Sequence, residues 1–211
     1  MTAGTIIGAR LGHVFFYEWP RYREHWVDIF KVWEGGLASH GGTLGVLIAL
    51  WLFHFTTKRY LPFSLLNWID IVSIPTAFVG CCIRIGNFIN QEILGTQTTL
   101  PWGVIFGNPA DGSVPEPRHP VQLYESLTYF ATFIFLLILW KKYHALKRPG
   151  LVSGLFFIIV FGSRFIFEVW KQPMSLMLDE SFIQTGQLLS IPFILLGVGL
   201  SAFGPKLSRE R

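Results

Sequence analysis

The stretch SFIQTGQLLSIPFILLGVGLSAFG, residues 181–204, contains no charged side chain. Lipid offers a buried backbone no hydrogen-bond partners, so a chain crosses a bilayer as a helix of about 20 mainly apolar residues. The stretch therefore predicts a membrane-spanning helix and a helical membrane protein. Four further apolar runs predict four more spans, at residues 121–140, 150–170, 35–55 and 65–85.

The composition agrees with a membrane protein and excludes several other classes. Hydrophobic residues make up 51% of the 211-residue chain and charged residues only 14%, whereas soluble domains carry about 25% charged residues. The net charge of +4 comes from scattered basic residues that form no stripe, so we expect no nucleic-acid partner. Cys81 and Cys82 are adjacent in an apolar run, which rules out a disulfide framework.

The segment Thr2–Phe16 is apolar but too short to span comfortably, and it carries Arg10, for which the sequence indicates no partner. It lacks the basic start of a signal peptide, and we interpret it as the remaining part of a longer helix. The sequence thus predicts one all-α, polytopic membrane domain over residues 1–211, with about five full spans plus a truncated N-terminal helix.

The basic residues predict the topology, because Lys and Arg accumulate in short cytoplasmic loops. One alternating assignment places on one face Lys58, Arg59, Lys141, Lys142, Lys147, Arg148, Lys206, Arg209 and Arg211, and on the other Arg21, Arg23, Lys31, Arg118 and Lys171. The larger group indicates a cytoplasmic C-terminus and an extracytoplasmic loop at residues 87–120. The unusual polar residues then gather at the outer helix ends.

Arg84 begins the motif RIGNFINQE, residues 84–92, at the end of a predicted span. A charge within a membrane segment is costly and points to function, and the guanidinium is suited to binding phosphate. Asn87, Asn90 and Glu92 add two amides and a carboxylate. The alternative is an arginine that snorkels to the interface and only anchors its helix.

Three further groups are candidates. Arg164 and Glu168 are four residues apart on one predicted helix, so we expect them to pair, with Arg164 as a second phosphate ligand. His40, in SHGG, is either a proton acceptor or a helix-end histidine bonded to a carbonyl. Tyr124 is either functional or an interfacial anchor, and the adjacent Glu125 needs a cation, Arg84 or Arg164. No histidine spacing is typical of a metal site.

Several of these motifs together resemble the bacterial prolipoprotein diacylglyceryl transferase family. The resemblance runs along the whole chain, through KVWEGG (31–36), SHGG (39–42), RIGNFINQEILG (84–95), HPVQLYE (119–125), RFIFE (164–168) and GQLLSIP (186–192). The chain departs from the family at Ile83, where Gly is usual, and at Lys171, where Arg is common. Family members also begin with a further helix, which we expect this chain to lack.

The resemblance implies transfer of the diacylglyceryl group of phosphatidylglycerol to the lipobox cysteine of a prolipoprotein, with release of glycerol phosphate. It implies an enzyme of the bacterial inner membrane, acting as a monomer on membrane lipid and a signal peptide, with its active site toward the extracytoplasmic side and no cofactor. The implied catalytic residues are His40, Arg84 and Arg164. The implied substrate-binding residues are Arg84, Asn87, Asn90, Glu92, Gly95, Tyr124 and Glu125.

Other classes stay open on the residues alone. Intramembrane Arg and Glu also line ion pathways, so a transporter is the main alternative. A structural subunit whose polar residues only join helices is another. Because the attacking sulfur belongs to the substrate, Cys81 and Cys82 are expected to be dispensable packing residues.

Overall fold

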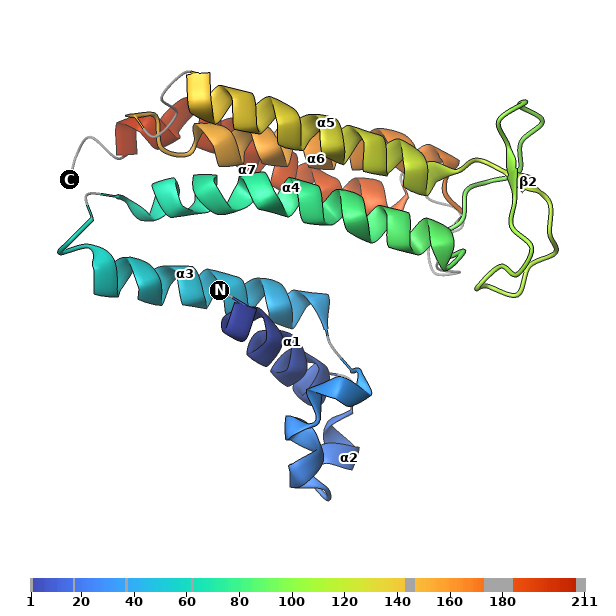
Figure 1. The fold of residues 1–211 in the computed structure, drawn as a ribbon, viewed down its shortest axis with the longest axis horizontal. Coiled ribbons are helices and arrows are strands. Elements are labelled where there is room, and N and C mark those ends of the chain that lie inside the picture. Colours follow the sequence, from blue (N-terminus) through green and yellow to red (C-terminus); the bar gives the residue numbers. More distant parts are fainter. Residues whose placement is uncertain are drawn as a thin grey trace. The chain divides into compact units, whose positions relative to one another are not determined.

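A computed structural model describes residues 2–16, 18–36, 38–61, 63–142, 147–172 and 184–207. The chain forms two compact units, Met1–Trp68 and Ile69–Arg211. In the first lie α1 (Thr2–Phe16), α2 (Trp19–Tyr22), the 3-10 turns η1 (Trp26–Phe30) and η2 (Val32–Glu34), and α3 (Ser39–Thr57). The second contains most of α4 (Leu65–Ile89), then β1 (Val104–Ile105), β2 (Pro117–Arg118), α5 (Val121–Lys142), α6 (Leu151–Phe167), η4 (Glu168–Trp170) and α7 (Thr185–Leu207) (Figure 1).

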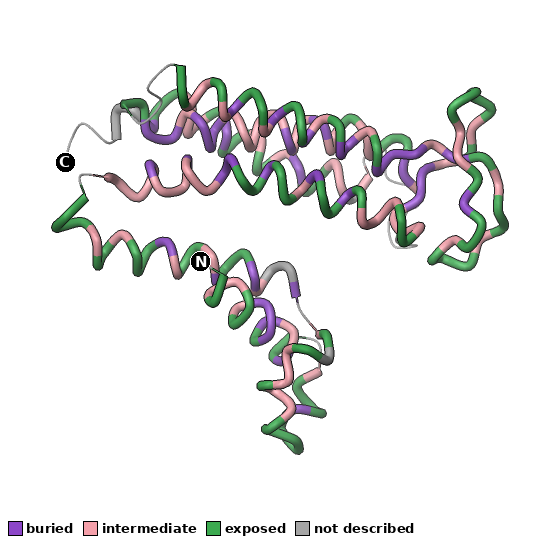
Figure 2. The backbone as a smooth tube through the Cα atoms, viewed as in Figure 1, coloured by how far each residue is buried: buried purple, intermediate pink, exposed green. Residues whose placement is uncertain are grey.

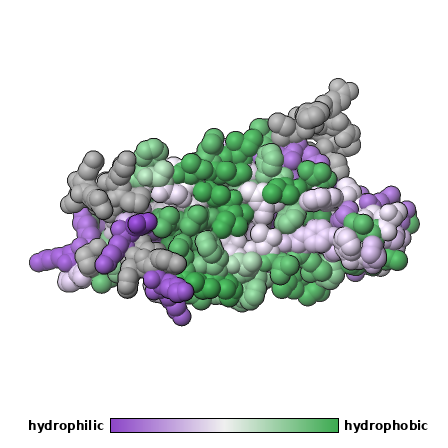
Figure 3. Space-filling view, turned by 90° about the horizontal axis from the view of Figure 1, so that it is seen from above, coloured by the Kyte–Doolittle hydropathy of each residue, from purple (hydrophilic) through white to green (hydrophobic). Residues whose placement is uncertain are grey.

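Four helices in the described ranges are long and apolar enough to cross a membrane, at Leu65–Ile89, Val121–Lys142, Leu151–Trp170 and Gly186–Gly204. They confirm four of the five predicted spans as apolar helices and indicate a multi-pass membrane protein. The face seen in Figure 3 is mainly hydrophobic along its middle, and its hydrophilic side chains gather mostly toward the two ends. Residues 181–183 of the opening stretch lie outside the described residues.

The predicted span 35–55 is wrong at its start. Gly35 and Gly36 have φ angles of 88° and 68°, which no right-handed helix accommodates. The helix α3 therefore begins at Ser39, and its apolar part, Gly41–Thr57, is shorter than the four spans above. The run predicted at 65–85 instead continues as helix to Ile89.

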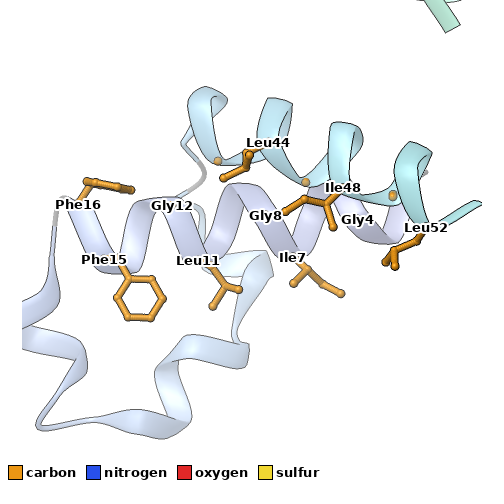
Figure 4. A pocket seen from close by; sticks show the side chains of 13 residues that line it. Gly4, Ile7, Gly8, Leu11, Gly12, Phe15, Phe16, Leu44, Ile48 and Leu52 are labelled. Atoms are coloured by element: carbon orange, nitrogen blue, oxygen red, sulfur yellow. The ribbon is translucent and has the colours of Figure 1, made fainter. Parts of the chain in front are cut away.

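In the first unit, α1 and α3 meet through glycines. A Cβ added to Gly8 would lie 2.3 Å from the Gly41 carbonyl oxygen, and one added to Gly45 would lie 2.0 Å from the Gly4 carbonyl oxygen. Only hydrogen side chains allow so close a backbone approach. An apolar groove of about 440 Å³ lies along this contact and is lined by side chains such as Leu11 and Leu44 (Figure 4).

Arg10, whose partner the sequence did not indicate, is 4% exposed and binds backbone carbonyls. Its Nε donates to the Ile29 oxygen at 2.9 Å, its Nη1 to the Gly35 oxygen at 2.6 Å, and its Nη2 to the Asp28 oxygen. Its guanidinium also lies 5.1 Å from the centre of the Tyr22 ring. Arg10 thus holds the segment 28–35, which follows α1, against that helix.

The second unit is a bundle of α4, α5, α6 and α7, with the β1–β2 hairpin beyond one end (Figure 1). Buried residues face its interior (Figure 2), where Ile74, Leu136 and Val152 form one cluster and Cys81, Tyr129 and Val160 another. These clusters join α4, α5 and α6, the three helices that carry most of the candidate site.

A buried carboxylate fixes the start of α6. Asp70 of α4 accepts hydrogen bonds from the Gly150 N–H at 2.7 Å, the Ser153 N–H at 2.8 Å and the Ser153 hydroxyl at 2.6 Å. The first turn of a helix leaves its N–H groups without intrahelical partners. Asp70 therefore caps α6 from a different helix and fastens α4 to α6.

Candidate functional site

Short extended segments form a small layer beyond one end of the helices of the second unit. Residues 94–98 lie in the middle, bridged at Gly95 to Lys171 on one side and at Gln97 to Arg118 on the other. Arg118 also pairs with Val104 in the β1–β2 hairpin. This layer brings the end of the 84–95 motif next to the start of α5 and the end of α6.

Glu125 is the centre of the candidate site. It is 1% exposed, and its Oε2 lies 2.8 Å from Arg84 Nε while its Oε1 lies 2.9 Å from Lys171 Nζ. The predicted pairing of Glu125 with a buried arginine is confirmed for Arg84. A carboxylate this deeply buried needs cationic partners, and Glu125 has two.

The motif around Arg84 forms a chain of polar contacts. Arg84 Nη1 donates to Asn87 Oδ1 at 3.1 Å, Asn87 Nδ2 donates to Glu92 Oε2 at 2.8 Å, and Asn90 Nδ2 lies 3.4 Å from Glu92 Oε1. Gln91 and Ile93 have φ angles of 56° and 55°, so the backbone on both sides of Glu92 is strained. The turn after α4 thus directs Glu92 back toward Asn87.

Gly95 has a steric reason to be glycine. A Cβ there would lie 2.2 Å from the His119 carbonyl oxygen and 2.9 Å from the His119 Cβ. The absence of a side chain lets the middle segment of the layer approach the start of α5. Gly95 therefore shapes the site through its backbone.

Tyr124 lies in a second polar group at the same end of the unit. Its hydroxyl accepts a hydrogen bond from Trp102 Nε1 at 2.9 Å and lies 3.4 Å from His119 Nδ1. Trp102 belongs to the long loop between α4 and α5, so this contact ties the loop to the first turn of α5.

A cavity of about 500 Å³ opens beside Glu92, and its other lining residues include Gln91, Asp111 and Gln172. The nearby Ser113 side chain, together with the Ser113 backbone N–H that donates to Asp111 Oδ1 at 3.0 Å, holds the pKa of Asp111 below its usual value. The Gln172 amide, oriented as its neighbours require, donates to Asp111 at 2.8 Å and accepts from Arg118 at 2.9 Å. The cavity thus combines carboxylate and amide groups with a mainly apolar lining that includes Ile93 and Leu94.

The expected pair of Arg164 and Glu168 is wrong. Glu168 Oε2 instead lies 3.0 Å from Lys171 Nζ, and within the described ranges no ion pair of Arg164 is found. Arg164 is half-buried, with its guanidinium 5.9 Å from the centre of the Phe161 ring. Arg164 and Arg84 both act electrostatically on the buried Tyr129, whose hydroxyl also interacts with the Arg84 side chain.

The structure does not test the role of His40. The residue lies in the first turn of α3, in the first unit, and its side chain lies outside what the structure describes. Of the cysteines, Cys81 is buried with its sulfur 3.2 Å from the Ser126 hydroxyl, and Cys82 is exposed. Among the described residues, no three His, Cys, Asp or Glu side chains lie close enough together to hold a metal ion.

Lys171, Arg118, Gln122 and Trp102 are site residues that sequence reasoning missed. The distribution of basic residues placed Lys171 and Arg118 in loops of one face, yet they are only 7% and 4% exposed. The buried Gln122 donates to the Glu92 carbonyl at 2.7 Å. Two signals were available for Lys171. It stands where the family commonly has Arg, and it follows Glu168 by three residues, which is the spacing of an ion pair across one helical turn.

Comparison with known proteins places the chain in a family. The model of the family described as "Prolipoprotein diacylglyceryl transferase" matches residues 1–203. Three relatives are named phosphatidylglycerol–prolipoprotein diacylglyceryl transferase. They are from Protochlamydia amoebophila, 52% identical over 93% of this chain, Tolumonas auensis, 47% over 96%, and Porphyromonas gingivalis, 45% over 93%.

The chain spans about half the length of the first of these relatives, 53%, and 76% and 72% of the other two. The family match begins before α1, includes Arg84, Glu125 and Lys171, and ends within α7. It therefore includes both compact units and every candidate site residue. The chain belongs to the prolipoprotein diacylglyceryl transferase family.

Proposed function

We propose that this protein transfers the diacylglyceryl group of phosphatidylglycerol to the cysteine thiol of a prolipoprotein lipobox. The observation that carries the proposal is the buried Arg84, 9% exposed, which is held by Glu125 and Asn87. Asn87 in turn donates to Glu92, which lines a cavity of about 500 Å³. The relatives bear the name of this activity, and the comparisons give the transporter alternative no support.

The proposed reaction replaces a carbon–oxygen bond by a carbon–sulfur bond. The lipobox thiolate attacks the glyceryl carbon that carries the phosphate, and the bonding electrons leave with the oxygen of glycerol phosphate. The phosphate gains negative charge in this step, so a fixed guanidinium stabilises the transition state more than the ground state. Arg84 and Arg164 are proposed for this role.

The proton of the thiol needs an acceptor, because a free cysteine has a pKa near 8.5 and the thiolate is the nucleophile. His40 is our candidate, either as the base or as a group that orients the thiol. Asn87, Asn90, Glu92, Gly95, Tyr124 and Glu125 are proposed to hold the headgroup or to orient the arginines. No cofactor is needed for this substitution.

The proposed setting is the bacterial inner membrane, with the C-terminus cytoplasmic and the site toward the extracytoplasmic side. The distribution of basic residues supports this orientation. It puts the cavity beside Glu92 on the side where the lipobox of an exported precursor emerges. We further propose that residues 1–211 act as one monomeric catalytic domain with five spans, the helix α3 being the fifth.

The test is the mobility shift of a lipobox peptide incubated with phosphatidylglycerol and membranes that contain the protein. We expect the wild type to modify the peptide, Arg84→Ala to abolish modification, and Arg59→Ala, at an exposed arginine, to leave it unchanged. Equal membrane content of the three proteins, checked by immunoblot, is the control for insertion. An unmodified peptide with the wild type would refute the proposed function.

A second comparison tests His40. We expect His40→Gln to lower the transfer rate by about 100-fold or more, in the range of general-base effects, while membrane content stays normal. Transfer at the wild-type rate would show that His40 has only a structural role.

A further inference from the structure

Glu92 lies in a turn whose backbone is strained on both sides. Gln91 and Ile93 have φ angles of 56° and 55°, in a region that residues with a Cβ adopt at a cost, above all a β-branched residue such as Ile93. Such a conformation persists only where the surrounding contacts hold it. The contacts of the turn 91–93 therefore determine where the Glu92 carboxylate lies.

Hydrogen bonds reach this turn from an exposed side and from a buried side. On the exposed side, the Asn108 N–H donates to Gln91 Oε1 at 2.6 Å, and the Ala110 N–H donates to the Gln91 carbonyl at 3.1 Å. On the buried side, Gln122 Nε2 donates to the Glu92 carbonyl at 2.7 Å. Asn108 and Ala110 are exposed, whereas Gln122 is 0% exposed. Because water does not compete with a buried hydrogen bond, the contact from Gln122 holds the turn more firmly than those from the loop.

The other atom of the same amide indicates what the glutamine contributes. Gln122 Oε1 is buried and has no hydrogen-bond partner in the described part of the chain. An unsatisfied buried acceptor lowers stability, and an apolar side chain of similar size, such as that of methionine, would avoid this cost. The donor to the Glu92 carbonyl is therefore what a glutamine supplies at this position.

The Glu92 carboxylate connects the turn to Arg84. Its Oε2 accepts a hydrogen bond from Asn87 Nδ2 at 2.8 Å, and Asn87 Oδ1 accepts one from Arg84 Nη1 at 3.1 Å. Glu92 also lines the cavity of about 500 Å³. A displacement of the turn would therefore move the carboxylate away from Asn87 and loosen the chain of polar contacts that ends at Arg84.

We propose that Gln122 is a positioning residue, which holds the strained turn 91–93 and so fixes the Glu92 carboxylate in the place where it receives the lipid headgroup. The inference rests on the proposed function, since it assigns Arg84, Asn87 and Glu92 to the phospholipid. Gln122 is completely buried and does not touch the substrate, and its effect passes through Glu92.

The experiment uses the full chain and has two readouts. Native mass spectrometry of the protein in detergent micelles, titrated with phosphatidylglycerol, gives the affinity for the lipid, and the lipobox peptide assay in membranes gives the transfer kinetics. The variants are Gln122→Met and the matched control Gln97→Met, which changes an exposed glutamine of the small layer.

We expect Gln122→Met to weaken binding of phosphatidylglycerol by about tenfold and to lower kcat/KM for this lipid by a similar factor. The KM for the peptide should stay within about threefold of wild type, because the displaced carboxylate serves the lipid. Gln97→Met should match the wild type in both readouts. If Gln122→Met does not accumulate in membranes, Gln122→Asn, whose shorter side chain places the amide one methylene further from the Glu92 carbonyl, takes its place.

Two double variants test whether the effect passes through Glu92. In a Glu92→Ala background the carboxylate that Gln122 positions is gone, so adding Gln122→Met should weaken lipid binding by less than about threefold. In a Tyr124→Phe background the same change should still weaken binding by about tenfold, because the Tyr124 hydroxyl belongs to the separate group with Trp102 and His119. Lipid binding is the readout for these variants, because it does not require turnover.

Three results would overturn the inference: wild-type affinity for phosphatidylglycerol in Gln122→Met, equal losses toward lipid and peptide, or a further tenfold loss when Gln122→Met is added to Glu92→Ala. The last result would show that Gln122 acts on the lipid independently of Glu92. A wild type that binds phosphatidylglycerol but leaves the lipobox peptide unmodified would refute the proposed function instead, and the binding measurements would still test the positioning role.

Discussion

Replacing Asp70 tests how strongly the bundle depends on a helix cap supplied from another helix. In Asp70→Ala, the N–H groups of Gly150 and Ser153 lose their acceptor, whereas the Ser153 hydroxyl can turn to the Gly150 carbonyl, 3.4 Å away. An unsatisfied buried N–H costs about 1–3 kcal/mol. The variant also no longer has to desolvate a carboxylate, which offsets part of this cost. We therefore expect the free energy of unfolding to fall by about 2–4 kcal/mol.

Two related variants grade the same interaction. Asp70→Asn keeps one acceptor oxygen but turns an NH₂ group toward the remaining donor, which predicts a loss of about 1–2 kcal/mol. Ser153→Ala removes only the hydroxyl donor and should cost about 1 kcal/mol. The exposed Asp111 is the matched control, and Asp111→Ala should cost less than about 0.5 kcal/mol.

The assay is reversible unfolding of the purified protein in mixed micelles by a denaturing detergent, followed by circular dichroism. The free energy of unfolding should fall in the order Ser153→Ala, Asp70→Asn, Asp70→Ala. An Asp70→Ala protein as stable as the Asp111→Ala control would refute the reasoning, because it would show that the first turn of α6 needs no acceptor from α4.

Three further predictions concern other parts of the chain. Gly8→Ala should destabilise the first unit by about 1–3 kcal/mol, since the new Cβ would lie 2.3 Å from the Gly41 oxygen; protease resistance of that unit measures it. Trp102→Phe removes the hydrogen bond to Tyr124 and should increase amide exchange in the loop by about tenfold. The pKa of Asp111 is lowered in the folded protein. The ionised Asp111 should therefore stabilise the loop above the ordinary pKa of an aspartate, and this stabilisation should be lost as the pH falls through the lowered pKa. Amide exchange of the loop measured against pH tests this.

The spans could be predicted, because the hydropathy of a segment reports whether it is compatible with lipid. The ends of the helices could not be predicted in this way. Gly35 looks like the start of a span by composition, yet its positive φ places it before the helix. At the other extreme, polar residues such as Arg84 and Asn87 suggested the end of a span, while α4 continues to Ile89. Helix ends depend on backbone angles and tertiary partners, which a hydropathy window does not contain.

The local part of the site was predictable for a similar reason. Arg84, Asn87 and Glu92 are close in sequence, and the turn after α4 keeps them close in space. Lys171 is 46 residues from Glu125, and it reaches the site because the extended layer pairs it with Gly95. That pairing is tertiary, so no reading of either motif alone predicts the contact.

The change of partner at Glu168 also bears on function. Glu168 begins the 3-10 turn η4, which has three residues per turn, so Lys171 lies one turn further on and pairs with it. Arg164 lies in an apolar helix, and no ion pair of Arg164 is found in the described part of the chain. An unpaired charge of this kind is costly in a membrane. An anionic substrate would supply the missing charge, which is a reason, independent of Arg84, to expect phosphate at this end of the bundle.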